Sequence, residues 1–161
     1  MILHGGLVAL RVRGYWRGVL IEGPSGAGKS DLALRMVDTG WRMVADDRVL
    51  LWLSGRGLYG RAPDTLTGKF EVRGVDILSE PPLPFCRISL SIVDGAPERL
   101  PLPQSVTHLG REVPRLVLPL LESSTSSKIA RAMWRLGGDD EGEYLGDRAG
   151  VNSPLSGGDS R

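Results

Sequence analysis

The chain has 161 residues, of which 41% are hydrophobic and 24% charged, so we expect about one soluble globular domain. Its net charge of +1 provides no extended basic field, which argues against a nucleic-acid-binding protein. No basic leader and no apolar run of membrane-spanning length occur, so we expect a cytoplasmic protein that does not engage a membrane. The lone Cys86 excludes an internal disulfide and is expected to pack as a small hydrophobe.

The N-terminal stretch predicts a β-hairpin. Apolar, β-forming residues occupy positions 2–12, and a second apolar run starts at Gly18 after a polar stretch that contains a glycine. His4 lies near the start of the first strand. A lone histidine on a strand is more often structural or solvated than catalytic, so by itself His4 is an ambiguous candidate.

The segment after the hairpin matches G-x-x-x-x-G-K-[ST] at every position, and it lies between a predicted strand and a predicted helix. Glycines allow the tight curl that turns backbone N–H groups toward phosphate oxygens, and the helix N-terminus favours the same anion. Lys29 would contact the β- and γ-phosphates of ATP, and the Ser30 hydroxyl would ligate Mg²⁺. The alternative is a glycine-rich turn that binds nothing. The predicted nucleotide-binding residues are Gly23, Pro24, Ser25, Gly26, Ala27, Gly28, Lys29 and Ser30.

A helix is predicted over 29–39, because its apolar residues recur on one side and Gly40 supplies a stop. A short buried strand over 41–45 follows and ends in Asp46 and Asp47. Near a phosphate loop, one carboxylate could hold Mg²⁺ or its waters, and the other could accept a proton from an attacking hydroxyl. The alternative is an acidic turn between two strands.

The remaining pattern predicts further strands and one helix before a polar end. Glu71 and Arg73 would share one face of a strand, where a surface ion pair is the simpler interpretation. Arg99 is either a solvated loop cation or an arm that reaches bound phosphate. The expected elements are strands over 49–53, 58–60, 70–75, 88–93 and 116–121, the last at an edge because of its proline, and a helix over 126–135. We expect a domain over 1–136 and a disordered tail over 137–161.

Three motifs then occur in order: the loop at 23–30, V-A-D-D at 44–47 and E-V-R-G at 71–74. With a His-Gly pair at 4–5, they resemble the catalytic domain of the HPr kinase/phosphorylase family over about residues 3–136. The resemblance implies the short form, which consists of the C-terminal catalytic domain. It also implies an α/β fold, with a P-loop (Walker A) nucleotide-binding domain of the HPr kinase/phosphoenolpyruvate carboxykinase type and a mixed β-sheet with flanking helices.

Family members use MgATP to phosphorylate a serine of HPr, a small carrier protein of the phosphotransferase system, and many also remove that phosphate. The resemblance therefore implies ATP and Mg²⁺ as cofactors, an HPr-like partner and a hexamer. Carried over by position, the resemblance implies that Asp47 is the proton acceptor, with Asp46 beside it, and that Lys29 and His4 lie in the active site. It implies Ser30 and Glu71 as magnesium ligands. It also implies that Arg73 and Gly74 belong to the catalytic signature and that Arg99 contacts phosphate.

One departure from the family pattern concerns the reverse reaction. The late P-G-R-N-type segment, which is tied to dephosphorylation, reads Leu-Glu-Ser-Ser-Thr over 121–125 and lacks the glycine and arginine. We therefore expect an ATP-dependent protein serine kinase with weak or no phosphorylase activity. The alternatives are a nucleotide-binding regulatory module without catalysis and a small-molecule P-loop kinase.

Overall fold

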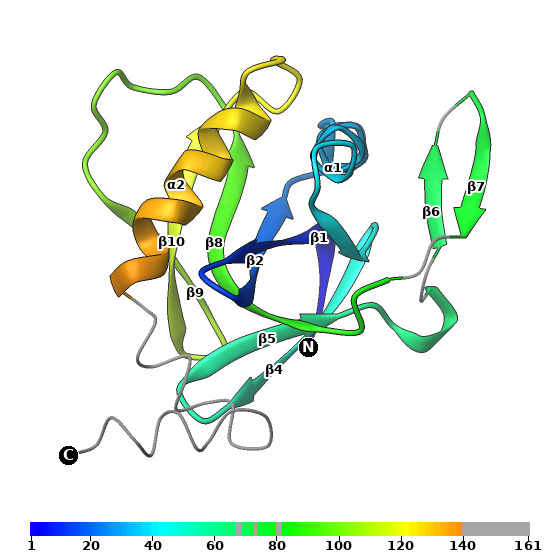
Figure 1. Cartoon of the computed structure of the whole chain (residues 1–161), viewed down its shortest axis with the longest axis horizontal. Coiled ribbons are helices and arrows are strands. Elements are labelled where there is room, and N and C mark those ends of the chain that lie inside the picture. The colour runs from blue at the N-terminus through cyan, green and yellow to red at the C-terminus, as the bar shows by residue number, and fades with distance from the viewer. Residues whose placement is uncertain (67–68, 73, 80–81, 140–161) are drawn as a thin grey trace.

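The computed structural model describes residues 1–66, 69–72, 74–79 and 82–139 (Figure 1). Most of these residues belong to strands. The described elements are β1 (Ile2–Val12), β2 (Tyr15–Glu22), α1 (Lys29–Val37), β3 (Arg42–Ala45), β4 (Arg48–Ser54), β5 (Gly57–Arg61), a 3-10 turn (Asp64–Leu66), β6 (Lys69–Val72), β7 (Asp76–Ser79), β8 (Cys86–Asp94), β9 (Gln104–His108), β10 (Arg111–Leu118) and α2 (Thr125–Asp139).

The main sheet is mixed, and it closes on itself. Strands β2, β1, β4, β5 and β8 pair in that order, and β2 also pairs with β8. The β2–β8 and β8–β10 pairs are parallel, whereas the other pairs of this sheet are antiparallel. The expected mixed α/β fold is therefore confirmed. Strands β6 and β7 form a separate hairpin beside the main sheet (Figure 1).

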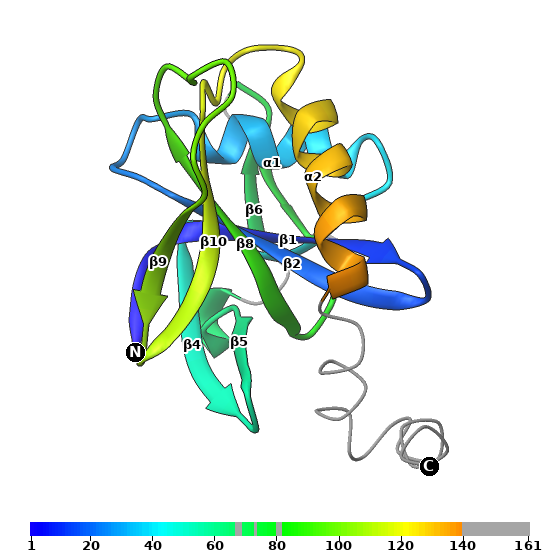
Figure 2. The same ribbon diagram turned by 90° about the vertical axis from the view of Figure 1, so that its left-hand side faces the viewer.

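Two apolar clusters occupy the two faces of this sheet, because successive side chains of a strand point to opposite faces. Helices α1 and α2 both cover one face, while β4 and β5 lie on the other side (Figures 1 and 2). On the helical face, Val19 and Ile21 of β2 pack with Leu32 of α1 and Ile129 of α2. The second cluster lies inside the closed sheet and contains residues of β1, β2, β4, β5 and β8. Among them are Leu7, Leu20, Val49, Leu58 and Ile88.

The predicted first helix is confirmed, and it forms for the reasons that the sequence gives. Leu32, Ala33 and Met36 are buried, as their helical spacing requires. The helix ends at Val37, and Gly40 with φ of 103° then turns the chain.

Cys86 is buried as expected, and burial raises the pKa of its thiol. Among the described residues, neither helix has the length and apolar character that a membrane crossing would need.

Several predicted boundaries were wrong. The strand expected over 70–75 ends at Val72, because a turn at Gly74 with φ of 84° sends the chain back as β7. β9 was not predicted. The last strand runs from Arg111 to Leu118 and lies between β8 and β9, so it is not an edge strand. Pro119 follows this strand, which explains why its missing N–H costs the sheet nothing.

The C-terminal boundary also differs from the prediction. Helix α2 continues to Asp139, beyond the expected boundary at 136. Residues 140–161, which hold the remainder of the expected disordered tail, lie outside the described residues, so that part of the prediction stays a prediction.

Close packing inside the closed sheet makes Gly18 sensitive to substitution. A Cβ there would lie 2.5 Å from the Cys86 Sγ and 2.9 Å from the Arg87 carbonyl oxygen, and backbone cannot easily yield. We expect Gly18→Ala to lower the free energy of unfolding by about 1–3 kcal/mol. Gly6→Ala is the matched control, because its Cβ would meet nothing closer than 3.8 Å. Urea unfolding followed by tryptophan fluorescence measures both, and equal stabilities would contradict the packing argument.

Candidate functional site

The glycine-rich loop connects β2 to α1, which confirms the strand–loop–helix context predicted for it. Gly26 has φ of 85° and Gly28 has φ of 103°, and both values lie in the left-handed region that favours glycine. The helix begins at Lys29, directly after Gly28. The first N–H groups of α1 have no partner within the helix, so this end of the helix suits an anion.

Lys29 is held inside the loop that precedes it. Its Nζ donates to the carbonyl oxygens of Gly23 and Pro24, at 2.7 Å each, and the residue is 8% exposed. Two carbonyl acceptors fix where the ammonium group lies, so its positive charge is held beside Gly23 and Pro24 at the start of the loop. A cation held in this way is suited to a phosphate group that enters the loop.

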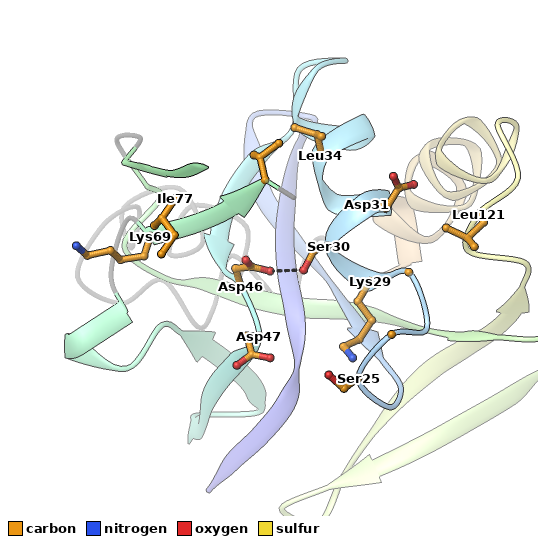
Figure 3. A pocket seen from close by; sticks show the side chains of 13 residues that line it. Ser25, Lys29, Ser30, Asp31, Leu34, Asp46, Asp47, Lys69, Ile77 and Leu121 are labelled. Carbon is orange, nitrogen blue, oxygen red and sulfur yellow. Dashed lines mark hydrogen bonds between the residues drawn. The ribbon is translucent and has the colours of Figure 1, made fainter. Parts of the chain in front are cut away.

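Ser30 and Asp46 face each other across the base of the site (Figure 3). The Ser30 hydroxyl donates to the Asp46 carboxylate at 2.8 Å, and Asp46 is 9% exposed. Hydroxyl and carboxylate oxygens are ligands that Mg²⁺ accepts, and Mg²⁺ commonly combines one or two protein carboxylates with substrate phosphates and water. This pair therefore fits a magnesium ion, although among the described residues no three acidic, histidine or cysteine side chains cluster to form a metal cage.

Asp47 differs from Asp46 in both exposure and backbone. Its side chain is 59% exposed, and its φ of 71° is unusual for a residue with a Cβ. The Asp47 carbonyl accepts a hydrogen bond from the Gly5 N–H at 3.0 Å. The His4 Nδ1 lies 4.0 Å from the Asp47 carboxylate. The fold thus brings the His-Gly pair of β1 beside the acidic pair, although 42 positions separate His4 from Asp46 in the chain.

Lys29, Ser30, Asp46 and Asp47 line one pocket of about 560 Å³, whose size suits a nucleotide-sized ligand. His4 and three of the predicted loop residues, Gly23, Pro24 and Ala27, are not among its lining residues. Lys29, Ser25 and Asp47 project toward a common space, whereas the Lys69 stem forms part of the opposite wall with its amine directed outward (Figure 3). The lining residues are Ser25, Gly26, Gly28, Lys29, Ser30, Asp31, Leu34, Asp46, Asp47, Lys69, Val72, Ile77 and Leu121. Sequence reasoning missed Lys69 and Ile77, because no local motif marks them, and it noted the segment that begins at Leu121 without placing that side chain at the pocket.

The segment after β10 supports the loop from outside. A Cβ on Gly28 would lie 2.8 Å from Leu121 Cδ2, so this leucine packs directly on the loop glycine. Arg35 of α1 donates to the carbonyl oxygens of Leu120 and Glu122, which fixes the segment against the helix. The chain stretch that replaces the P-G-R-N-type motif is therefore a packing element of the pocket.

The remaining predicted residues are less well connected to this site. Glu71 lies on β6 with its backbone opposite Ile77, and its side chain, like the whole of Arg73, lies outside what the structure describes. Arg99 is exposed in the loop after β8 and is not among the pocket-lining residues. Its predicted phosphate contact stays a prediction.

A buried carboxylate lies at the end of β2, and sequence reasoning missed it. Glu22 directly precedes Gly23, and its side chain is 11% exposed. It accepts hydrogen bonds from Arg115 Nη2 at 2.8 Å and Ser91 Oγ at 2.5 Å, and His108 Nε2 lies 3.2 Å away. Burial acts to raise the pKa of Glu22, but the bonds from Ser91, Arg115 and His108 outweigh it, so the pKa is lowered.

Comparisons with known proteins agree with this architecture. Residues 1–80 match the model of the HPr Serine kinase C-terminal domain. An HPr kinase/phosphorylase of Streptococcus thermophilus is 46% identical over 77 residues, which cover 47% of this chain and 24% of the relative. One of Clostridium acetobutylicum is 42% identical over 81 residues, or 50% of this chain and 25% of the relative. The matches thus span about a quarter of those relatives.

A solved structure extends the likeness of fold beyond residue 80. The HPr(Ser) kinase/phosphatase from Coxiella burnetii superposes with a TM-score of 0.71 and 23% identity, covering 89% of this chain and 97% of that chain. At this identity the superposition shows a shared fold. The sequence matches identify the family: the chain belongs to the HPr kinase/phosphorylase family, as the three motifs predicted.

The lowered pKa of Glu22 predicts an acid-sensitive part of the stability. A carboxylate whose folded pKa is below its ordinary value of 4.5 stabilises the fold above that value, and this contribution is lost as the pH falls through the folded pKa. We expect Glu22→Gln to cost about 2 kcal/mol at about pH 5.5, and the difference from wild type to shrink toward about pH 3.

Urea unfolding at the two pH values measures this difference. Glu112→Gln is the control, because Glu112 is an exposed glutamate that also accepts a hydrogen bond from a serine, Ser105. It should change the stability by less than about 0.5 kcal/mol at either pH. A Glu22→Gln deficit that stays constant down to about pH 3 would contradict the assignment.

Proposed function

We propose that this protein is an ATP-dependent kinase that phosphorylates a serine of an HPr-like phosphocarrier protein. One observation carries the proposal. The buried Lys29, the Ser30–Asp46 pair and the exposed Asp47 all line the same pocket. Lys29, Ser30 and Asp46 suit a nucleoside triphosphate and its metal, while Asp47 suits an incoming hydroxyl.

The nucleotide side of the site follows from the loop. Backbone N–H groups of the loop and the N-terminus of α1 would bind the β- and γ-phosphates, with Lys29 as the neutralising cation. Ser30 and Asp46 would hold Mg²⁺, with Glu71 as a further ligand by the family resemblance. When bound, Mg²⁺ would neutralise negative charge on the β- and γ-phosphate oxygens.

The acceptor side of the site depends on Asp47. In the proposed step, the serine hydroxyl gives its proton to the Asp47 carboxylate as the serine oxygen bonds to the γ-phosphorus. The bond between that phosphorus and the bridging oxygen to the β-phosphate breaks, and ADP leaves. The backbone of Asp47 is anchored through Gly5, so the part of the chain that carries the base is fixed before the acceptor arrives.

His4 is proposed to lie beside this base in the active site and not to react. Its ring lies 4.0 Å from the Asp47 carboxylate, and its side chain is 65% exposed. At this distance the imidazole is a polar neighbour of the carboxylate without a direct hydrogen bond to it. Arg73 and Arg99 keep the roles implied by the resemblance, as cations for the transferred phosphoryl group.

The partner and the cellular setting follow from the relatives. The names of the matched relatives specify HPr as the protein that they phosphorylate, which supports an HPr-like carrier as partner. A hexameric assembly and a cytoplasmic location belong to the same proposal. Size-exclusion chromatography with light scattering would test the assembly directly.

Two substitutions separate nucleotide binding from phosphoryl transfer. Lys29→Ala should raise the dissociation constant for MgATP by about tenfold or more, because it removes the positive charge that would contact the β- and γ-phosphates. Asp47→Asn should leave MgATP affinity within about twofold and lower the transfer rate to HPr by about 10²–10⁴. Calorimetric titration and transfer of labelled phosphate to HPr measure the two effects.

The control for this pair is Asp64→Asn, because Asp64 is an exposed aspartate bonded to Arg61 and is not among the pocket-lining residues. It should match wild type in both assays. Wild-type transfer by the Asp47→Asn variant would refute the base assignment. MgATP binding by the wild type without transfer to any HPr would instead indicate a regulatory nucleotide-binding module.

The reverse reaction is expected to be weak. The segment 121–125 lacks the glycine and arginine of the family motif, and its Leu121 packs on Gly28 of the loop with an apolar side chain. With serine-phosphorylated HPr, Mg²⁺ and inorganic phosphate, we expect pyrophosphate release at least about tenfold slower than forward transfer. The Streptococcus thermophilus relative is the positive control. Release at the forward rate would contradict this expectation.

A further inference from the structure

The carboxylate of Glu22 is a charged group that the proposed chemistry does not use. It lies at the end of β2, one residue before the loop, and is almost fully buried. Burying a carboxylate is costly unless charged and hydrogen-bonding partners compensate. This position therefore needs a reason beyond filling space.

The compensation comes from three other strands. Arg115 of β10 donates to Glu22 at 2.8 Å and also to the Ser91 Oγ at 3.2 Å. Ser91 of β8 donates to the carboxylate at 2.5 Å, and the His108 ring of β9 lies within 3.2 Å of both carboxylate oxygens. Four strands are thus tied together at the point where the loop leaves the sheet. We call Glu22, Ser91, His108 and Arg115 the β2-end network.

The network is not arranged as a catalytic site. Ser91 bonds to the carboxylate and not to the imidazole, so His108 cannot act as its base in this arrangement. Ser91 is fully buried, and none of the four residues lines the pocket. A ligand in this pocket therefore does not contact these groups, and any effect that they have on it passes through the backbone.

The backbone route to the pocket is short. Glu22 is followed by Gly23 and Pro24, whose carbonyl oxygens are the two acceptors that hold the Lys29 ammonium group. A side chain that holds the end of β2 therefore constrains the position from which the Gly23 peptide starts, and the Gly23 carbonyl is one of the two acceptors that hold the Lys29 cation. Asp47 is anchored by a different contact, through the N–H of Gly5 on β1.

We propose that Glu22 is a positioning residue for the nucleotide, which acts through Gly23 and Lys29 without touching the ligand. This inference rests on the proposed function, because it assumes that the loop binds MgATP. It assigns the β2-end network to nucleotide affinity and leaves the chemical step to Asp47.

Glu22→Gln tests the proposal, because the amide keeps the shape of the side chain and removes its charge. Titration of the full-length variant with a fluorescent ATP analogue and Mg²⁺ should give a dissociation constant raised about tenfold, with about one site for each folded chain. The transfer rate at saturating nucleotide should stay within about twofold of wild type. Glu112→Gln, the exposed glutamate on β10, should bind as wild type does.

A merely structural role gives a different result. Loss of folded protein lowers the number of binding sites and leaves the dissociation constant of the remaining sites unchanged, and this outcome overturns the proposal. If Glu22→Gln does not fold, Ser91→Ala replaces it, because it removes the two hydrogen bonds of the Ser91 hydroxyl, to Glu22 and from Arg115, and keeps the charges of both of those side chains. It should raise the dissociation constant about threefold, and a wild-type value overturns the proposal. Failure of the wild type to bind the analogue overturns the proposed function itself.

Discussion

The parallel pairing of β2 with β8 is the contact on which the rest of the structure depends. It closes the sheet, and so it creates the enclosed apolar cluster on one face and the surface on which both described helices pack. Because the two strands run in the same direction, the loop after β2 and the segments that follow β8 and β10 leave the sheet at the same end. The candidate site is assembled at that end.

Charge is distributed unevenly around the loop, and the distribution follows burial. Lys29 and Asp46 are nearly buried, each bonded to a fixed neighbour, whereas Asp47 is open to solvent. Groups that must hold still are thus enclosed, and the group proposed to meet a protein partner is accessible. The Glu22 carboxylate, which directly precedes the loop, balances the positive charge of Arg115 outside the pocket.

Local sequence determined the parts that were predicted well. The hairpin, the glycine-rich loop, α1 and the acidic pair each depend on spacing within a few residues, and the order of three motifs was enough to indicate the family. The parts that were missed depend on contacts between distant segments. β9 has a weak pattern of its own, the Glu22 partners come from 69 to 93 positions away, and Leu121 reaches Gly28 only through the fold. No local motif could reveal them.

The backbone conformation of Asp47 limits what this position can become over evolutionary time. A left-handed φ of 71° is tolerated by aspartate, asparagine and glycine, but it strains other side chains. Drift away from a carboxylate would therefore pass first through asparagine or glycine. A homologous domain that keeps this fold but no longer transfers phosphate would therefore be expected to carry asparagine or glycine here, because these residues accept the backbone conformation.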